Sequence, residues 1–383
     1  MEFKKSQALT FGMELELQIV SAATGTLSPS SLAFWEIVKQ RTDAERFSLE
    51  ATLSTMELNT SVHTDADEMA AEAVALTQVL CDVAAPMNLM IRGGGTQLTQ
   101  FWNERVLAPT DRAAELSRRF GYLPKRFSTY GMHVHIGAAS ADDAIHMGNG
   151  LQALVPLFIA MSAASPYLQL EDTGFCASRP LEPLIYPHGG PMPRLKNWTE
   201  FERLAQDIFS TPLATSLKDV YWDVRPKPEF GTIEVRVFDT PLSVAKAVGL
   251  AAFTRGCAAL ILQGKLALPT TPSPPTAERV SRFFACRDGL DAELFDPFTQ
   301  QWKPARDWCA SLIQSIEQSP VCEADVEHIR RLHAHIGNEQ DATLMRNTWE
   351  ETLNVDHQVQ SKDDGLVNNS KALSQHLLAP MRG

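Results

Sequence analysis

Two histidines spaced as on a β-strand are the first residues in this sequence that could carry out chemistry. Residues 131–137 read Gly-Met-His-Val-His-Ile-Gly, so His133 and His135 alternate with apolar side chains. At the two-residue period of a strand, both imidazoles lie on one face and the apolar residues on the other. The pattern predicts a half-buried strand that presents two imidazoles to a cavity.

Three other short stretches repeat this pattern with carboxylates. Their polar positions are Glu14 and Glu16 in residues 12–18, Glu57 and Asn59 in 55–60, and Glu234 and Arg236 in 232–237. One such strand alone is most often the solvent face of a surface sheet. These four contain no Lys, and carboxylates gathered on one face repel each other unless cations neutralise them. Oxygen ligands with one or two imidazoles suit Mg²⁺ or Mn²⁺ better than a structural zinc. We therefore expect a sheet whose concave face binds several metal ions.

The composition is that of a globular protein with a substantial core, because 44% of the 383 residues are hydrophobic. The formal net charge is −12 and no Lys/Arg block could follow a phosphate backbone, which argues against nucleic acid as a partner. No apolar run precedes the first acidic strand, and no later segment has the length of uncharged apolar sequence that a membrane span needs. We expect neither a signal peptide nor a membrane span. The six cysteines form no CxxC pair, which is typical of reduced thiols in a cytoplasmic protein.

The predicted strands lie in the first two thirds of the chain and are separated by helices. Helices are expected at about 31–41, 65–91, 111–119, 140–163 with a kink near Pro156, 198–209 and 241–263. Residues 164–197 are rich in Pro and Gly, and so long an irregular stretch in a compact domain is typical of a binding loop. Short strands with one polar row favour an α+β fold, in which helices pack on the apolar face of an antiparallel or mixed sheet.

The whole chain, residues 1–383, is expected to be a single catalytic domain. Its sheet-bearing part covers about 1–265, a Pro-rich segment crosses at 268–275, and a helical C-terminal part covers about 277–353. The tail at 360–383 is expected to be only partly ordered.

The sequence lacks the motifs of the commonest nucleotide-binding and hydrolytic sites. It contains no P-loop, no dinucleotide-binding glycine motif after a strand, no G-x-S-x-G and no H-E-x-x-H. A carboxylate-rich site with several divalent ions and an adjacent Arg is what phosphoryl transfer from ATP requires. The ions bridge the polyphosphate oxygens, and the Arg stabilises charge on the group being transferred.

The order and spacing of these motifs resemble those of the glutamine synthetase-like carboxylate-amine ligases. Within that group the chain is most similar to the glutamate–cysteine ligase type 2 family, also called the YbdK-like carboxylate-amine ligases. The resemblance, over roughly residues 10 to 350, is carried by 12–16, Glu50, Glu57, 131–135, 165–166, 172–175, 178–179, 221–226 and 230–240. One departure is Gln97-Leu98, where the family commonly has His-Pro after Gly-Thr, so the substrates of this chain could differ from those of the family.

The resemblance implies a sheet that forms a funnel, with ATP at one end and an amino-acid substrate at the other. It implies two metal sites, one held by Glu16, Glu50 and Glu57 and the other by Glu14, His133 and Glu234. It also implies two or more Mg²⁺ (or Mn²⁺) ions and ATP as co-substrate. Arg236 and Glu234 would be the catalytic residues, with Arg236 contacting both the nucleotide and the phosphoryl group in flight.

The reaction that the resemblance implies is the joining of an acid to an amine. A substrate carboxylate, the γ-carboxylate of glutamate in the type reaction, attacks the γ-phosphoryl of ATP. An amine such as cysteine then captures the acyl phosphate, which gives an amide, ADP and phosphate. Family members are often dimers or larger, which implies a homo-oligomer.

Further residues are candidates for binding substrates. These are Arg179, Arg225, His135 and Asn59 for the amino-acid substrates and Arg346 for the nucleotide. Arg binds carboxylate and phosphate groups bidentately, although each Arg in a loop could equally tie down that loop. His135 could also be a metal ligand or bond only to a strand neighbour.

Two other functions remain open. A metal-dependent hydrolase of the amidohydrolase kind also uses an H-x-H strand, but it normally needs further His ligands where this chain has Glu. It also needs no nucleotide, so ATP binding separates the two enzymes. A non-catalytic member of the fold could bind small molecules, although the presence of all six presumed ligands together with Arg236 argues against that.

Overall fold

The centre of the protein is one seven-stranded sheet. The computed structural model describes residues 1–126, 129–338 and 340–355. The strand order is β10-β11-β5-β1-β3-β2, with β4 also paired to β1, and every neighbouring pair is antiparallel. The strands are β1 (Phe11–Ser21), β2 (Phe47–Leu49), β3 (Thr55–Asn59), β4 (Leu89–Arg92), β5 (Gly131–Gly137), β10 (Val224–Lys227) and β11 (Thr232–Asp239). The predicted α+β class with an antiparallel sheet is confirmed.

Twelve α-helices are present in the described residues. They are α1 (Ser31–Val38), α2 (Ala66–Ala84), α3 (Asp111–Phe120), α4 (Leu123–Arg126), α5 (Ala141–Ala153), α6 (Val155–Ser162), α7 (Trp198–Phe209), α8 (Val244–Leu262), α9 (Pro275–Asp288), α10 (Ala305–Glu317), α11 (Glu323–Asn338) and α12 (Asp341–Val355). The predicted kink falls between α5 and α6, which are bent by 60°, and Pro156 lies in the first turn of the second helix.

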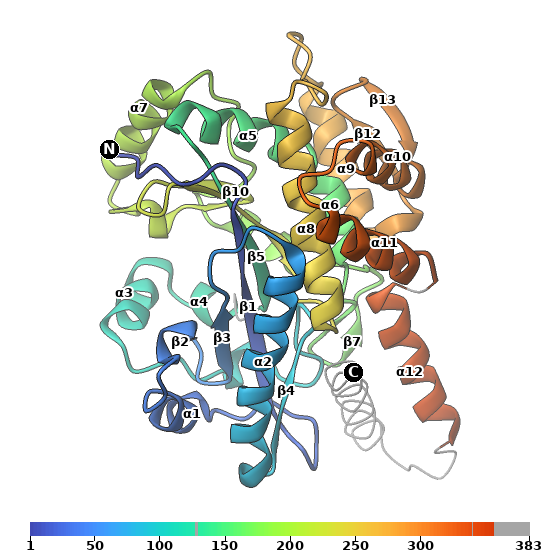
Figure 1. Cartoon of the computed structure of the whole chain (residues 1–383). Coiled ribbons are helices and arrows are strands. Elements are labelled where there is room, and N and C mark those ends of the chain that lie inside the picture. Colours follow the sequence, from blue (N-terminus) through green and yellow to red (C-terminus); the bar gives the residue numbers. More distant parts are fainter. Residues whose placement is uncertain (127–128, 339, 356–383) are drawn as a thin grey trace.

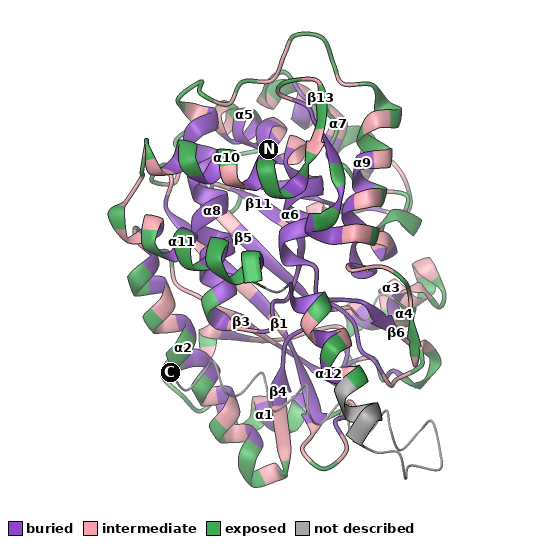
Figure 2. Ribbon diagram, turned by 90° about the vertical axis from the view of Figure 1, so that its right-hand side faces the viewer, coloured by how far each residue is buried: buried purple, intermediate pink, exposed green. Residues whose placement is uncertain are grey.

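The apolar face of the sheet is covered by helices α2, α5, α6 and α8 (Figure 1). Alternate residues of β1, such as Met13, Leu15 and Leu17, are buried against them. Figure 2 shows that α8 is buried along its length, while α2 and α11 keep exposed outer faces. The hydrophobic core therefore lies on one side of the sheet and leaves the polar row on the other side open.

Within the described residues, two helices are long and apolar enough to cross a membrane by length and composition alone, namely Ala66–Met87 and α8. Helices α5 and α6 would do so only as one bent span. In α8, 94% of the apolar window is buried inside the protein, and Lys246 near its start lies 3.1 Å from Asp341 of α12. The absence of a membrane span stays a prediction.

Two predicted elements differ from the structure. The α-helix expected at 65–91 ends at Ala84, because a single 3₁₀ turn that contains Pro86 follows at Ala85–Met87 and Asn88 then adopts a left-handed conformation with φ 55°. The chain then reverses into β4, where Ile91 pairs with Ile19 of β1. The C-terminal part expected to be helical also contains a hairpin of β12 (Glu293–Asp296) and β13 (Gln301–Pro304).

Residues 164–197 are largely irregular, as predicted. They contain the short strands β6 (Tyr167–Leu168), β7 (Glu171–Asp172) and β8 (Gly189–Gly190), and the 3₁₀ helix η4 (Arg179–Ile185). The two-residue strand β9 (Tyr221–Trp222) pairs with β8 and ties this stretch to the start of β10.

The main hydrophobic cluster includes residues from β1 to α11. We therefore propose that the described part of the chain is one domain. The predicted tail at 360–383 lies outside the described residues.

Candidate active site

The pairing register of the sheet places the predicted polar rows side by side. Glu14 on β1 lies opposite His133 on β5 and, across its other edge, opposite Asn59 on β3. Glu16 lies opposite Glu57. Antiparallel neighbours directly opposite each other are close enough for their side chains to interact, so the alternation seen in the sequence becomes one continuous polar surface.

Strand β11 extends this surface with Glu234, which lies opposite His135 on β5 and opposite Arg225 on β10. After Glu234 the register between β11 and β5 shifts, which is a β-bulge, a common means of re-aiming a side chain next to an active site. Arg236 lies in this irregular part. Its backbone N–H donates to the carbonyl of Asp223 at 2.8 Å, and its guanidinium donates to Glu234.

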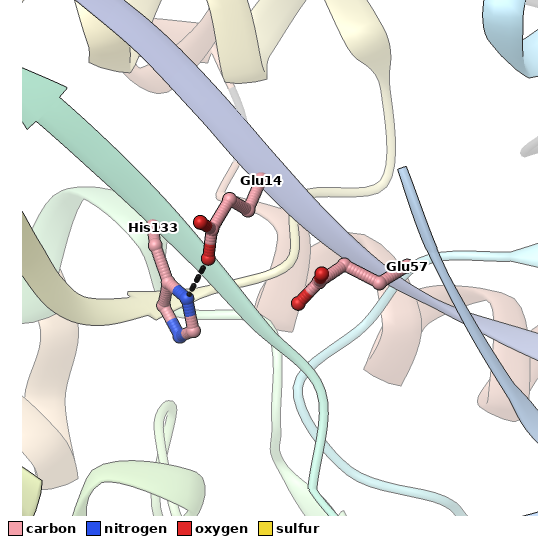
Figure 3. A group of neighbouring side chains, drawn as sticks. All are labelled: Glu14, Glu57 and His133. Atoms are coloured by element: carbon pink, nitrogen blue, oxygen red, sulfur yellow. Dashed lines mark hydrogen bonds and ion pairs between the residues drawn. The ribbon is translucent and has the colours of Figure 1, made fainter. Parts of the chain in front are cut away.

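In the part of the chain that the structure describes, three groups of side chains bring possible metal-ligand atoms within 4.8 Å of one another. They are Glu16 with Glu50 and Glu57, Glu14 with Glu57 and His133, and Glu14 with His135 and Glu234. His133 Nδ1 lies 2.7 Å from Glu14 Oε2. Figure 3 shows this contact, with the Glu57 carboxylate directed toward the same space. The first group contains the same three residues as the first of the two predicted metal sites.

The second predicted site, Glu14 with His133 and Glu234, is divided between the other two groups. His133 Nδ1 is 3.8 Å from Glu234 Oε1, and His135 Nε2 is 3.7 Å from the same oxygen and 3.1 Å from Glu14 Oε1. The geometry thus adds His135 to the candidate ligands, which is the alternative that the sequence left open for it.

Burial and crowding act on the first group of carboxylates. Burial raises the pKa of Glu50 well above its usual range, and the nearby carboxylates of Glu57 and Glu16 raise it further. The pKa values of Glu57 and Glu16 are also raised, again chiefly by burial. Three half-buried carboxylates at this spacing need protons or a cation to balance them. A set of carboxylates with nearby imidazoles fits Mg²⁺ or Mn²⁺.

The other two carboxylates are held ionised by their neighbours. Burial opposes the charge of Glu14, but hydrogen bonds from His133 and His135 hold its pKa well below the usual range. Burial also opposes the charge of Glu234, yet Arg225 and Arg236 hold its pKa far below the usual range. Both groups therefore offer charged oxygens at neutral pH.

Two cavities meet at Glu14. The first, which we call the carboxylate cavity, has a volume of about 250 Å³ and is lined by Glu14, Glu16, Glu50, Glu57, His133, Glu234, Arg179, Arg225, Lys227, Arg236, Tyr186, Tyr221, Leu116, Pro124 and Thr129, among others. The second, which we call the Phe230 cavity, measures about 500 Å³ and is lined by Glu14, His135, Phe230, Val62, Phe11, Met13, Asn59, Thr60, Lys4, Arg46 and Glu229, among others. The polar face of the sheet therefore opens toward two separate spaces.

Two predicted substrate-binding arginines are already engaged by the protein. Arg225 places Nε and Nη2 each 2.8 Å from Glu234 Oε2 and donates through Nη1 to the carbonyls of Leu217 and Val220. Arg179 lies at the end of the carboxylate cavity, with Nη1 and Nη2 3.4 Å from the carbonyl of Arg236. Arg225 is thus placed to orient Glu234, whereas Arg179 keeps a face toward the cavity.

Asn59 and His135 both line the Phe230 cavity. Asn59 donates to Ser48 Oγ at 2.8 Å and to Glu57 Oε1 at 3.1 Å. Asn59 therefore also helps to fix the Glu57 carboxylate.

Arg346 does not line either cavity, and neither do Gln97 and Leu98, the two residues that differ from the family pattern. Both cavities are defined here by the described residues. Arg346 binds Asp172 bidentately at 2.7 and 2.8 Å and donates to the carbonyl of Phe175. Gln97 and Leu98 are fully buried. Any effect of these residues on substrates would be indirect.

Several lining residues were not found from the sequence. Lys227 lies two residues after Arg225 on β10 and faces the same way, so extending the two-residue period would have found it. Tyr186 directly follows the 3₁₀ helix η4, and Tyr221 lies in the two-residue strand β9, which is too short to show a period.

Comparison with known proteins gives the class of the fold. The crystal structure of glutamate–cysteine ligase from Francisella tularensis in complex with AMP is similar at TM-score 0.64 and 13% identity, over 98% of this chain and 90% of that chain. A bifunctional glutathione synthetase from Pasteurella multocida is similar at TM-score 0.63 and 13% identity, over 97% of this chain but 52% of that one. At this identity the likeness establishes the fold, which is that of the glutamate–cysteine ligases.

The family follows from the sequence match. The model of glutamate-cysteine ligase family 2 (GCS2) matches residues 10–362, so the chain belongs to that family. The predicted enzyme class, a glutamate–cysteine ligase-like carboxylate-amine ligase, is confirmed at this level. The hydrolase alternative depended on the H-x-H strand, and that strand is part of the sequence that matches a ligase family. The match therefore argues against the hydrolase.

Proposed function

We propose that the protein joins an acid to an amine at the expense of ATP, through an acyl phosphate. The observation that carries this proposal is the sheet face on which three carboxylate-rich groups and Arg236 lie between two cavities that share Glu14. One cavity can hold the nucleotide and the other the acid and amine, with phosphoryl transfer at the shared wall.

The Phe230 cavity suits the nucleoside. Phe230 and Val62 are left 58% and 74% exposed at its wall, and large apolar side chains in a hollow are surfaces on which a planar base can stack. The complex of the Francisella tularensis enzyme with AMP shows that another protein of this fold binds a nucleotide, which supports a nucleotide here. The phosphates of a nucleotide placed here would extend toward Glu14 and His135.

The carboxylate cavity suits the acid and the amine. Arg179 presents a buried guanidinium to it, and a substrate carboxylate can pair with such a group bidentately. Tyr186 and Tyr221, whose ring centres are 4.7 Å apart, also line this cavity. By family analogy we propose glutamate as the acid and cysteine or another amine as its partner.

The metal ions, two or more Mg²⁺ or Mn²⁺, would be held by the three groups of ligands and would neutralise the polyphosphate when bound. Arg236, anchored by Glu234, is placed to stabilise negative charge on the γ-phosphoryl as it moves. A substrate carboxylate oxygen attacks the γ-phosphorus, and the bond from that phosphorus to the bridging oxygen of ADP breaks. The amine nitrogen then attacks the acyl carbon and loses a proton, and phosphate leaves with the former carboxylate oxygen.

Loops and helices over the open face would limit the entry of water. Leu116 of α3, Pro124 of α4 and Tyr186 after η4 line the carboxylate cavity from the side opposite the sheet. An acyl phosphate hydrolyses readily, so a covered site favours capture by the amine. We also propose, from the family resemblance, a homo-oligomer in the cytoplasm.

The test is release of ADP from Mg-ATP with pools of acids and amines, beside the same assay without any amine. Turnover that depends on both an acid and an amine would support the ligase and identify the substrates as the pools are divided. Turnover without an amine, or none with any combination, would contradict the proposal.

A further inference from the structure

Lys227 occupies an unusual position at the end of the polar row. It is the last residue of β10, lies opposite Thr232 of β11, and faces the same side as Arg225. Thr232 Oγ1 is 3.0 Å from His135 Nδ1. Lys227 therefore extends the row of ligands and arginines by one cation, beside the imidazole that lines the Phe230 cavity.

Lys227 and the turn that follows it lie at the boundary between the two cavities. Lys227 itself lines the carboxylate cavity, while Glu229 and Phe230 line the Phe230 cavity. The backbone N–H groups of Phe230 and Gly231 both donate to the carbonyl of Lys227, at 3.1 and 2.9 Å. Gly231 has φ 67°, and a Cβ there would lie 1.8 Å from the carbonyl oxygen of Lys4, so the turn requires glycine. The position of Lys227 is thus fixed by the hairpin.

The side chain of Lys227 is 12% exposed, and its ammonium group pairs with a carboxylate that is itself exposed. Its Nζ lies 3.0 Å from Glu229 Oε1 and 5.2 Å from the centre of the Phe230 ring. The Glu229 side chain is 46% exposed, and ion pairs with so exposed a partner contribute little to stability. A Lys side chain is flexible and binds phosphate as a point charge. Nζ can therefore leave Glu229 for a polyphosphate, whereas Arg225 cannot leave Glu234 without uncovering a buried charge.

We propose that Lys227 binds the polyphosphate chain of ATP as it passes from the Phe230 cavity to the metal ligands, and that Glu229 holds the ammonium group until the nucleotide enters. This assignment rests on the proposed function, because it places the nucleoside in the Phe230 cavity. It makes Lys227 a nucleotide-binding residue, separate from Arg236, which acts on the transferred group.

The test is the affinity of the purified full-length chain for Mg-ATP and for adenosine, measured by titration calorimetry. Lys227→Met should weaken Mg-ATP binding by about tenfold to a hundredfold, the usual effect of losing a charged hydrogen bond, and leave adenosine binding unchanged. Lys227→Arg should retain most of the affinity. Equal weakening of adenosine and Mg-ATP, or Mg-ATP binding like that of the wild type, would overturn the assignment.

Two further variants keep the result interpretable. Lys303→Met is the matched control. Lys303 also has a carboxylate partner, Asp296, and its Nζ lies 5.2 Å from the centre of the Trp308 ring, but it is on β13 and lines neither cavity. This variant should bind Mg-ATP like the wild type, and a loss equal to that of Lys227→Met would count against the proposal. Glu229→Gln frees Lys227 without touching it, and it should tighten Mg-ATP binding. Unchanged or weaker binding would contradict the role given to Glu229.

These titrations need no turnover, so they fail separately from the proposed function. If the wild type binds Mg-ATP and Lys227→Met does not, but no acid and amine are joined, the ligase proposal fails and the Lys227 assignment stands. If amide is formed and Lys227→Met binds Mg-ATP normally, only the Lys227 assignment fails.

Discussion

Replacing Glu50 by Gln should make the metal-free protein more stable and at the same time abolish turnover. Oxygens of Glu16, Glu50 and Glu57 lie within 4.8 Å of one another. At an effective dielectric constant of about 20, two unit charges at that separation repel by about 3.5 kcal/mol. Bound protons relieve part of this repulsion, because burial raises the pKa of Glu50 and the neighbouring carboxylates raise it further. We therefore expect the free energy of unfolding at pH 8 to rise by about 1–2 kcal/mol.

The assay is urea unfolding of the wild type and of Glu50→Gln, in EDTA and again with excess Mg²⁺. Without metal the variant should have the higher midpoint at an unchanged slope. With Mg²⁺ the wild type should gain more than the variant, because metal that binds only the folded state stabilises it. The variant should form no ADP with the substrates that the wild type uses.

A matched control separates this effect from the general removal of a buried acid. Glu182 is buried on η4, but Arg126 pairs with it at 2.8 Å. Glu182→Gln should leave stability unchanged or lower it, with no dependence on Mg²⁺. A metal-free Glu50→Gln protein that is less stable than the wild type would refute the argument from repulsion, and full activity in that variant would remove Glu50 from the metal site.

Three other predictions concern the same row. The metal-free wild type should lose stability as pH rises from about 5 to 8. Carboxylates whose pKa is raised in the folded state, Glu50 foremost, stabilise the fold below their unfolded-state pKa, and this stabilisation is lost as the pH passes their folded-state pKa. Urea midpoints that do not change with pH would contradict this prediction. Arg236→Lys should lower kcat by about tenfold or more and change the Kd for ATP much less, since Lys cannot make the bidentate contact; unchanged kcat would exclude Arg236 from the mechanism. Arg225→Met should lower the free energy of unfolding by about 3 kcal/mol and weaken Mg²⁺ binding, because buried Glu234 loses a partner. Calorimetry that shows wild-type Mg²⁺ affinity would argue against a positioning role for Arg225.

The sheet and its polar face could be predicted because the pattern is local. The two-residue period assigns Glu14, His133 and Glu234 to one face of their strands, and antiparallel pairing then needs only the right register to bring them together. Local signals were also sufficient for α7 and for the kinked pair α5 and α6, whose bend could be placed from Pro156.

The remaining features depend on tertiary contacts. Residues 89–92 follow an apolar helix and resemble its continuation, but pairing with β1 makes them a strand. The division of Glu14, His133 and Glu234 between two groups depends on side-chain reach across the sheet, which spacing alone does not give. The roles of Arg225 and Arg346 also could not be predicted. The sequence does not show that Arg225 is already bonded to Glu234, or that Arg346 is already bonded to Asp172.

The most direct test of the central claim is transfer of oxygen from the acid substrate to phosphate. The acid, labelled with ¹⁸O in its reacting carboxylate, is turned over with Mg-ATP and the amine, and the phosphate released is analysed by mass spectrometry. An acyl phosphate on the pathway predicts one ¹⁸O in each phosphate formed, because the carboxylate oxygen that attacks the γ-phosphorus leaves with it. Phosphate without label, formed together with amide, would contradict the account.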